Sequence, residues 1–74
     1  MATNAKAAKQ ISDLMWEILR KIEESLDAVK QTCSPEQFTA YHRVVGEIVR
    51  PIMFQVLEPL YNDNPALKPA GWDK

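Results

Sequence analysis

The sequence "TCSPEQF" at residues 32–38 is the one strong interruption in a chain that is otherwise rich in helix-forming residues. Ser34 is a typical N-cap, Pro35 suits the first helical position, and Gln37 completes a capping box with Ser34. Proline also disfavours a helical conformation at the residue before it, so a preceding helix must end before Ser34. Because the connection is so short, the sequence predicts two helices that lie side by side and antiparallel.

The segment before this break, residues 5–32, contains neither proline nor glycine. Its apolar residues recur at intervals of three and four, as in an amphipathic helix with one buried face. We therefore expect a first helix over about residues 5–32, with Leu14 and Leu19 at the edges of the apolar stripe. The stripe consists of Ile11, Met15, Ile18, Ile22, Leu26, Val29 and Cys33.

A second helix is expected from Pro35 to about Tyr61. Its apolar arc spans about 220° of the helix surface, roughly twice what one neighbouring helix covers. The monomer supplies one neighbour, so the simplest source of another is a second copy of the chain. The predicted fold is an all-α antiparallel hairpin that dimerises into a four-helix bundle. The predicted dimer-interface residues are Phe38, Tyr41, Val45, Ile48, Val49, Ile52 and Val56.

Self-association also suits the length of the chain, which is one domain of 74 residues. Such short chains bury a small share of their surface and often depend on a disulfide, a metal or association. Cys33 is the only cysteine, which excludes a disulfide within the chain. No group of residues has the spacing of metal ligands, so we expect neither metal nor cofactor.

Pro51 lies inside the second predicted helix and removes one backbone hydrogen bond, the one to the carbonyl of Glu47. We expect the helix to bend or loosen there, with Gly46 absorbing part of the crowding. The bend would let the helix wrap around its partner, and a functional hinge is the alternative. A second proline, Pro59, is expected to weaken the last turn.

Residues 62–74 form a polar, proline-rich tail that contains the apolar residues Leu67 and Trp72. The tail is expected to fold back onto the bundle, and the alternative is an exposed peptide ligand held extended by its prolines. Phe54 lies among charged residues of the second helix, so we expect it to pack under the docked tail or to contact a partner. The candidate residues for a tail or partner contact are Trp16, Phe54 and Trp72.

Catalytic residues are not evident in the sequence. His42 is the only histidine, and it is expected in the interface rather than as a base. Cys33 is expected to be a small apolar filler, because a nucleophile needs a base close by and His42 lies more than two turns along the next helix. Phosphate-binding, nucleophile-elbow and zinc-protease motifs are missing as well. We expect a protein that is not an enzyme.

Nucleic acid is the alternative partner, although the net charge of -1 gives no general attraction to phosphate. The predicted architecture is similar to that of small dimeric helical hairpins that bind RNA, such as plasmid copy-number regulators of the Rop type. This similarity concerns the architecture and implies an RNA- or DNA-binding regulator as the alternative function. The candidate contact residues are Arg20, Lys21, Arg43 and Arg50.

The apolar segment 44–61 carries Glu47, Arg50 and Glu58 as well as two prolines, so it is not expected to span a membrane. The N-terminus lacks the apolar run of a secretory signal, and the lone cysteine favours a reducing compartment, so we expect the cytoplasm. A homodimer that acts as a protein–protein interaction, adaptor or regulatory module is the favoured function.

Overall fold

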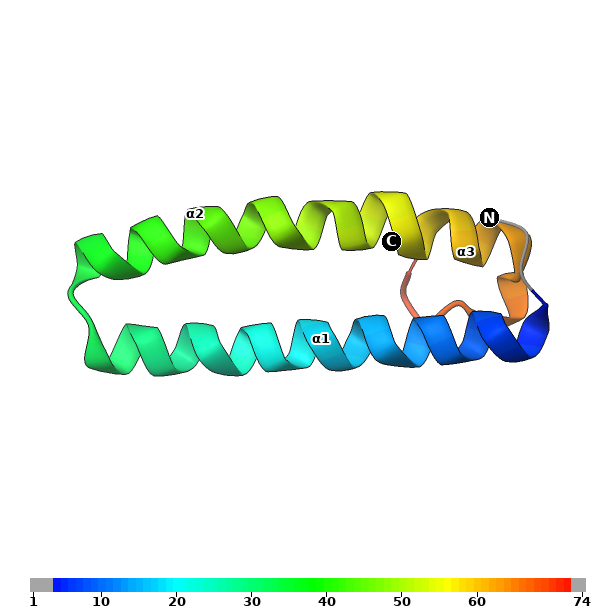
Figure 1. Cartoon of the computed structure of the whole chain (residues 1–74), viewed down its shortest axis with the longest axis horizontal. Coiled ribbons are helices and arrows are strands. Elements are labelled where there is room, and N and C mark those ends of the chain that lie inside the picture. Colours follow the sequence, from blue (N-terminus) through cyan, green and yellow to red (C-terminus); the bar gives the residue numbers. More distant parts are fainter. Residues whose placement is uncertain (1–3, 73–74) are drawn as a thin grey trace.

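The computed structural model describes residues 4–72, which form the all-α hairpin predicted from the sequence (Figure 1). Two long helical arms run antiparallel and are joined by a short turn at Cys33 and Ser34. Residues 73 and 74 of the predicted tail lie outside the described part. The elements are the α-helix α1 (Ala5–Thr32), the α-helix α2 (Pro35–Pro51), the π-helix η1 (Ile52–Leu57), the α-helix α3 (Glu58–Asp63) and the 3-10 helix η2 (Pro65–Leu67).

The predicted capping box at the start of α2 is confirmed. The backbone N–H of Gln37 donates to the Ser34 Oγ (3.2 Å), and the backbone N–H of Ser34 donates to the Gln37 Oε1 (2.9 Å). At the start of α1, the Asn4 side chain accepts a hydrogen bond from the N–H of Ala7 (2.8 Å). Both long helices therefore begin at side chains that satisfy otherwise unpaired N–H groups.

The hairpin is a single layer of helices, with extents of 44 × 21 × 16 Å. Its buried core lies at the terminal end, the end opposite the turn, where Ala8, Leu57, Leu60 and Tyr61 form one cluster. In the half of the hairpin nearer the turn, Val45 is the one buried apolar residue that the structure describes. A layer of this thickness covers one side of each helix and leaves much of the apolar surface of both arms open.

The second arm changes its helical geometry directly after Pro51, where the sequence predicts a bend. Pro51 has no N–H, and the N–H of Ile52 donates to the carbonyl of Val49 instead. Through η1 the hydrogen bonds span five residues, as in the bond from the N–H of Glu58 to the carbonyl of Met53. The proline is thus accommodated by a wider turn, and the arm continues as α3.

This wider turn decides which residues face the core. In an uninterrupted α-helix Tyr61 would point about 160° away from Val45, on the far side of the arm. One extra residue in the turn reduces this angle to about 60°, and it reduces the angle of Leu57 from about 120° to about 20°. Leu60 lies within about 60° of Val45 in either case. All three side chains are fully buried. A helical wheel that treats the whole second arm as one α-helix therefore gives the wrong direction for the side chains after Pro51.

The tail folds back onto the hairpin, as the sequence predicts. Residues Pro65–Leu67 form η2, and a tight turn follows in which the N–H of Trp72 donates to the carbonyl of Pro69 (3.1 Å). Gly71 has a φ of 85° in this turn, a conformation that side-chain-bearing residues rarely adopt. The turn returns Trp72 to the surface of the hairpin.

Candidate interaction surfaces

An aromatic cluster of Ser12, Trp16, Tyr61 and Trp72 joins α1, α3 and the tail at the terminal end. The Trp16 indole N–H donates to the Tyr61 hydroxyl (2.8 Å), and the hydroxyls of Ser12 and Tyr61 share a hydrogen bond (2.5 Å). Trp72 packs edge-on against Tyr61 and against Trp16, with ring centroids 5.0 Å and 6.3 Å apart. The hydroxyls of Ser12 and Tyr61 and the indole N–H of Trp16 are hydrogen-bonded within the cluster, which thereby joins three segments of the chain.

The opposite side of the hairpin is apolar and uncovered. This surface, which we call the open face, consists of Leu14, Ile18 and Ile22 on α1 and of Val44 and Ile48 on α2. Leu14, Val44 and Ile48 are 50% or 51% exposed, and the two isoleucines of α1 are half-buried. Three apolar residues of the open face also line a shallow groove along α1, together with Glu17, Lys21 and Ser25.

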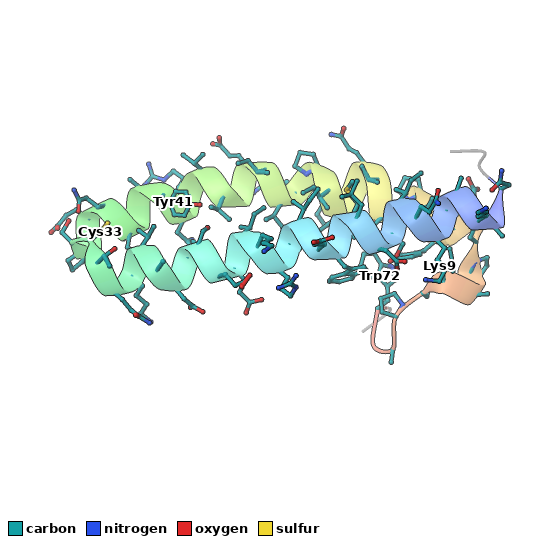
Figure 2. All side chains as sticks on the ribbon, turned by 60° about the horizontal axis from the view of Figure 1, so that its bottom comes forward. Lys9, Cys33, Tyr41 and Trp72 are labelled. Atoms are coloured by element: carbon teal, nitrogen blue, oxygen red, sulfur yellow. The ribbon has the colours of Figure 1, made fainter. Side chains whose placement is uncertain are left out.

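One hydrogen bond shows that the two rows of the open face lie on the same side. The hydroxyls of Ser25 and Tyr41 are 2.7 Å apart and connect α1 to α2. Ser25 follows Ile18 and Ile22 along their face of α1, and Tyr41 precedes Val44 and Ile48 along theirs at helical spacing. Figure 2 shows Tyr41 on α2 near the turn, and the tail with Trp72 beside α1 at the terminal end. The tail leaves the open face uncovered.

Charged side chains flank the open face along both of its long edges. The outer edge of α1 carries Glu17 and Lys21, one helical turn apart, and both are exposed. The outer edge of α2 carries Arg43, Glu47 and Arg50, which are exposed as well. Within residues 4–72 these five side chains form no ion pair with one another or with other groups, whereas Lys9 pairs with Asp13 and Arg20 with Glu24.

The predicted dimer-interface residues divide between the two sides of α2. Val45 is 5% exposed and buried inside the hairpin, so it is not available to a second copy in this conformation. Phe38, Val49, Ile52 and Val56 are half-buried, as is Tyr41. Ile48 is the member of the set that lies half-exposed on the open face. The inner side of α2 is therefore largely used by the hairpin itself.

The residues predicted for tail or partner contacts also divide. Trp16 and Trp72 contact each other, and Trp16 remains 39% exposed. Phe54 does not pack under the tail as expected: its side chain is 62% exposed on the outer side of η1. The tail binds the side of the hairpin that Trp16 occupies, so Trp72 is held there and cannot cover Phe54.

The four basic residues considered for nucleic acid are all exposed, but they do not converge in the hairpin. Arg20 lies on α1 and contacts Glu24 (3.4 Å). Arg43 and Arg50 lie on α2, at the edge that points away from α1. A phosphate backbone is bound by several cationic side chains that gather in one place. The four basic residues of a single chain do not gather in this way.

The chemical groups singled out in the sequence lie apart from one another. Cys33 is exposed at the turn, not a filler of the apolar stripe, because α1 ends at Thr32 and the backbone is already extended at Cys33. His42 is exposed on α2 and its ring lies against Phe38, with centroids 5.8 Å apart. No three potential metal ligands gather anywhere within residues 4–72.

Among the described residues, no helix has the length and hydropathy required to cross a membrane. Comparisons with protein-family models, with curated proteins and with solved structures found no match. The functional proposals below therefore depend on the surfaces of this chain alone.

Sequence reasoning missed the α1 half of the open face. The sequence pattern assigns Ile18 and Ile22 to the buried stripe and Leu14 to its edge, whereas in the structure these three residues, spaced at intervals of four, line an open groove. Sequence reasoning also missed the partnership of Ser12 with Tyr61. That contact depends on the register set by η1, and no local sequence pattern predicts it.

Proposed function

We propose that this chain is a non-enzymatic interaction module that self-associates through its open face into a four-helix bundle. The supporting observation is the open face itself, where Leu14, Val44 and Ile48 leave about half of their surface in water on a chain with a small core. Contiguous exposed apolar surface of this kind is typical of protein–protein contacts. A second copy would give each arm the second helical neighbour that the hairpin lacks.

The outward surfaces of such a dimer would be free to contact another protein. Phe54 is the most exposed large apolar residue of the described chain, and it lies outside the open face. In this proposal the dimer acts as an adaptor or regulatory subunit that presents its outer helical surfaces, including Phe54, to a partner. The lone, exposed Cys33 fits a reducing compartment, and we therefore propose a cytoplasmic location.

The proposal is tested by placing one charge on the open face and one outside it. Ile48→Asp should shift the protein from dimer to monomer in sedimentation velocity, because the carboxylate would be buried without a partner at the interface. Phe54→Asp serves as the matched control and should remain a dimer. Both side chains are exposed in the single chain. If the monomeric hairpin is stable, circular dichroism should therefore show similar helix content for the two variants.

If Ile48→Asp and Phe54→Asp sediment alike, the open face is not the association surface. A loss of helix in Ile48→Asp together with dissociation would mean that folding and association are coupled. Leu14→Asp then provides the second test from the other helix, and it should give the same loss of dimer.

A further inference from the structure

The open face also contains information on how the two copies are oriented, an inference that rests on the self-association proposed above. We propose that the copies dock with their turns at the same end, so that α1 of each chain lies against α2 of the other. The two-fold axis then runs parallel to the helices. The alternative is an axis across the helices, with the turns at opposite ends and α1 against α1.

The hairpin defines which residues lie at the same height. Ser25 and Tyr41 are hydrogen-bonded across the hairpin and therefore lie at the same height along it. Their residue numbers add up to 66. Because the arms run antiparallel, other pairs with a similar total also lie level with one another. A two-fold axis parallel to the helices preserves heights, so each residue of α1 meets the partner's residue that is level with it.

The apolar rows match at these heights. Ile18 is level with Ile48, and Ile22 with Val44. Each row advances in steps of four residues, so these two levels are in phase. Leu14 is level with Ile52, which is half-buried and packs against the core of its own hairpin. An axis across the helices at Ile18 and Ile48 would match apolar rows too, because the rows are symmetric about these two residues. The apolar pattern thus predicts a complete overlap of the two copies, and the charges select the orientation.

The charged edges are complementary when the turns lie at the same end. Glu17 then meets Arg50 of the second copy, and Lys21 meets Glu47. One turn further, Glu24, which contacts Arg20 of its own chain (3.4 Å), is level with Arg43 of the second copy. Three levels in succession bring opposite charges together, and the two-fold axis repeats them on the other edge. In the opposite-end arrangement Glu17 would meet Lys21 of the second copy and Glu47 would meet Arg50, but Asp13 would face Glu24, so one of the three levels places like charges together.

An interface of standard size would use most of the broad side of the hairpin. The hairpin presents an outline of 44 Å by 21 Å, or about 900 Å² in projection, against about 800 Å² per partner in a standard interface. The tail packs on the other side of the hairpin through Trp72, so docking on the open face does not displace it.

The natural cysteine at the turn offers a direct test of the orientation. Cys33 is exposed and is the only cysteine of the chain, so a spin label can be attached to the protein without other changes. With helices packed about 8–10 Å apart, turns at the same end should give a label–label distance of roughly 15–25 Å. Turns at opposite ends should give about 40 Å, the length of the long helix. Dilution with excess unlabelled chain should remove either signal.

Charge reversal provides the second measurement. Lys21→Glu and Glu47→Lys should each raise the dimer Kd by about ten-fold, because two facing pairs per dimer become repulsive. The double variant should return the Kd close to that of the wild type. Glu23→Lys is the control, since Glu23 is exposed on another side of α1, and it should leave the Kd unchanged.

The two proposals fail in different ways. A dimer with a Cys33 distance of about 40 Å, or without compensation between Lys21→Glu and Glu47→Lys, overturns the orientation and leaves self-association intact. A wild-type chain that stays monomeric overturns both.

Discussion

Tyr61 is the residue on which the packed end of the molecule depends. Its side chain is fully buried, yet its hydroxyl is satisfied by Ser12 and by the indole of Trp16. A buried polar group that lost these partners would cost a substantial part of the stability of so small a domain. The same ring supports Trp72, so one side chain connects α1, α3 and the tail.

We expect Tyr61→Phe to lower the free energy of unfolding by about 1–3 kcal/mol, because it leaves the Ser12 hydroxyl without its partner and the Trp16 N–H without its acceptor. Tyr41→Phe is the matched control and should cost less, since the Ser25 hydroxyl still donates to the carbonyl of Ile22 (2.7 Å). Urea unfolding followed by circular dichroism measures both. Equal losses in the two variants would contradict a special role for the Tyr61 hydroxyl.

At the scale of elements, the π-helix η1 acts as a one-residue insertion in the second arm. Pro51 removes a hydrogen-bond donor, and the wider turn after it rotates Leu57 and Tyr61 toward α1. The insertion is retained because the core it creates contains three fully buried side chains. The sequence therefore specifies the break locally at Pro51, whereas packing decides how the break is resolved.

Deletion of Gln55, an exposed residue of η1, should convert the π-helix into an ordinary α-helix and keep Tyr61 in the core. The variant should retain its helix content and unfold within about 1 kcal/mol of the wild type. Deletion of Glu23 is the control: it is also exposed, but it lies inside α1 and would rotate half of that helix by about 100°. Its circular dichroism should show loss of the cooperative fold. If the Gln55 deletion is as damaging as the Glu23 deletion, η1 does not set the register.

These elements also show how much of the structure could be predicted from the sequence alone. The turn at Ser34 and Pro35 could be predicted because capping and proline sterics act over a few residues. The contact between Ser12 and Tyr61 could not, since it joins segments 49 positions apart through a register that η1 resets. Nor could the wide apolar arc of α2 tell which part faces α1. The structure resolves this by burying Val45 and leaving Ile48 half-exposed.

At the scale of the whole molecule, the hairpin has two unlike sides. The tail and the aromatic cluster occupy one side at the terminal end, and the open face occupies the other. A single layer of two arms buries little apolar surface near the turn, where Val45 stands alone among the described residues. A second layer supplied by another copy would bury the open face and give the turn half of the molecule a core.

The mass of the wild-type protein in solution is the most direct test of self-association through the open face. Sedimentation equilibrium over a concentration series should give twice the chain mass of 8.4 kDa at micromolar concentrations, with dissociation toward the monomer on dilution. Helix content should fall in parallel if the second layer stabilises the hairpin. A well-folded particle of 8.4 kDa at all concentrations up to the millimolar range would contradict self-association through the open face.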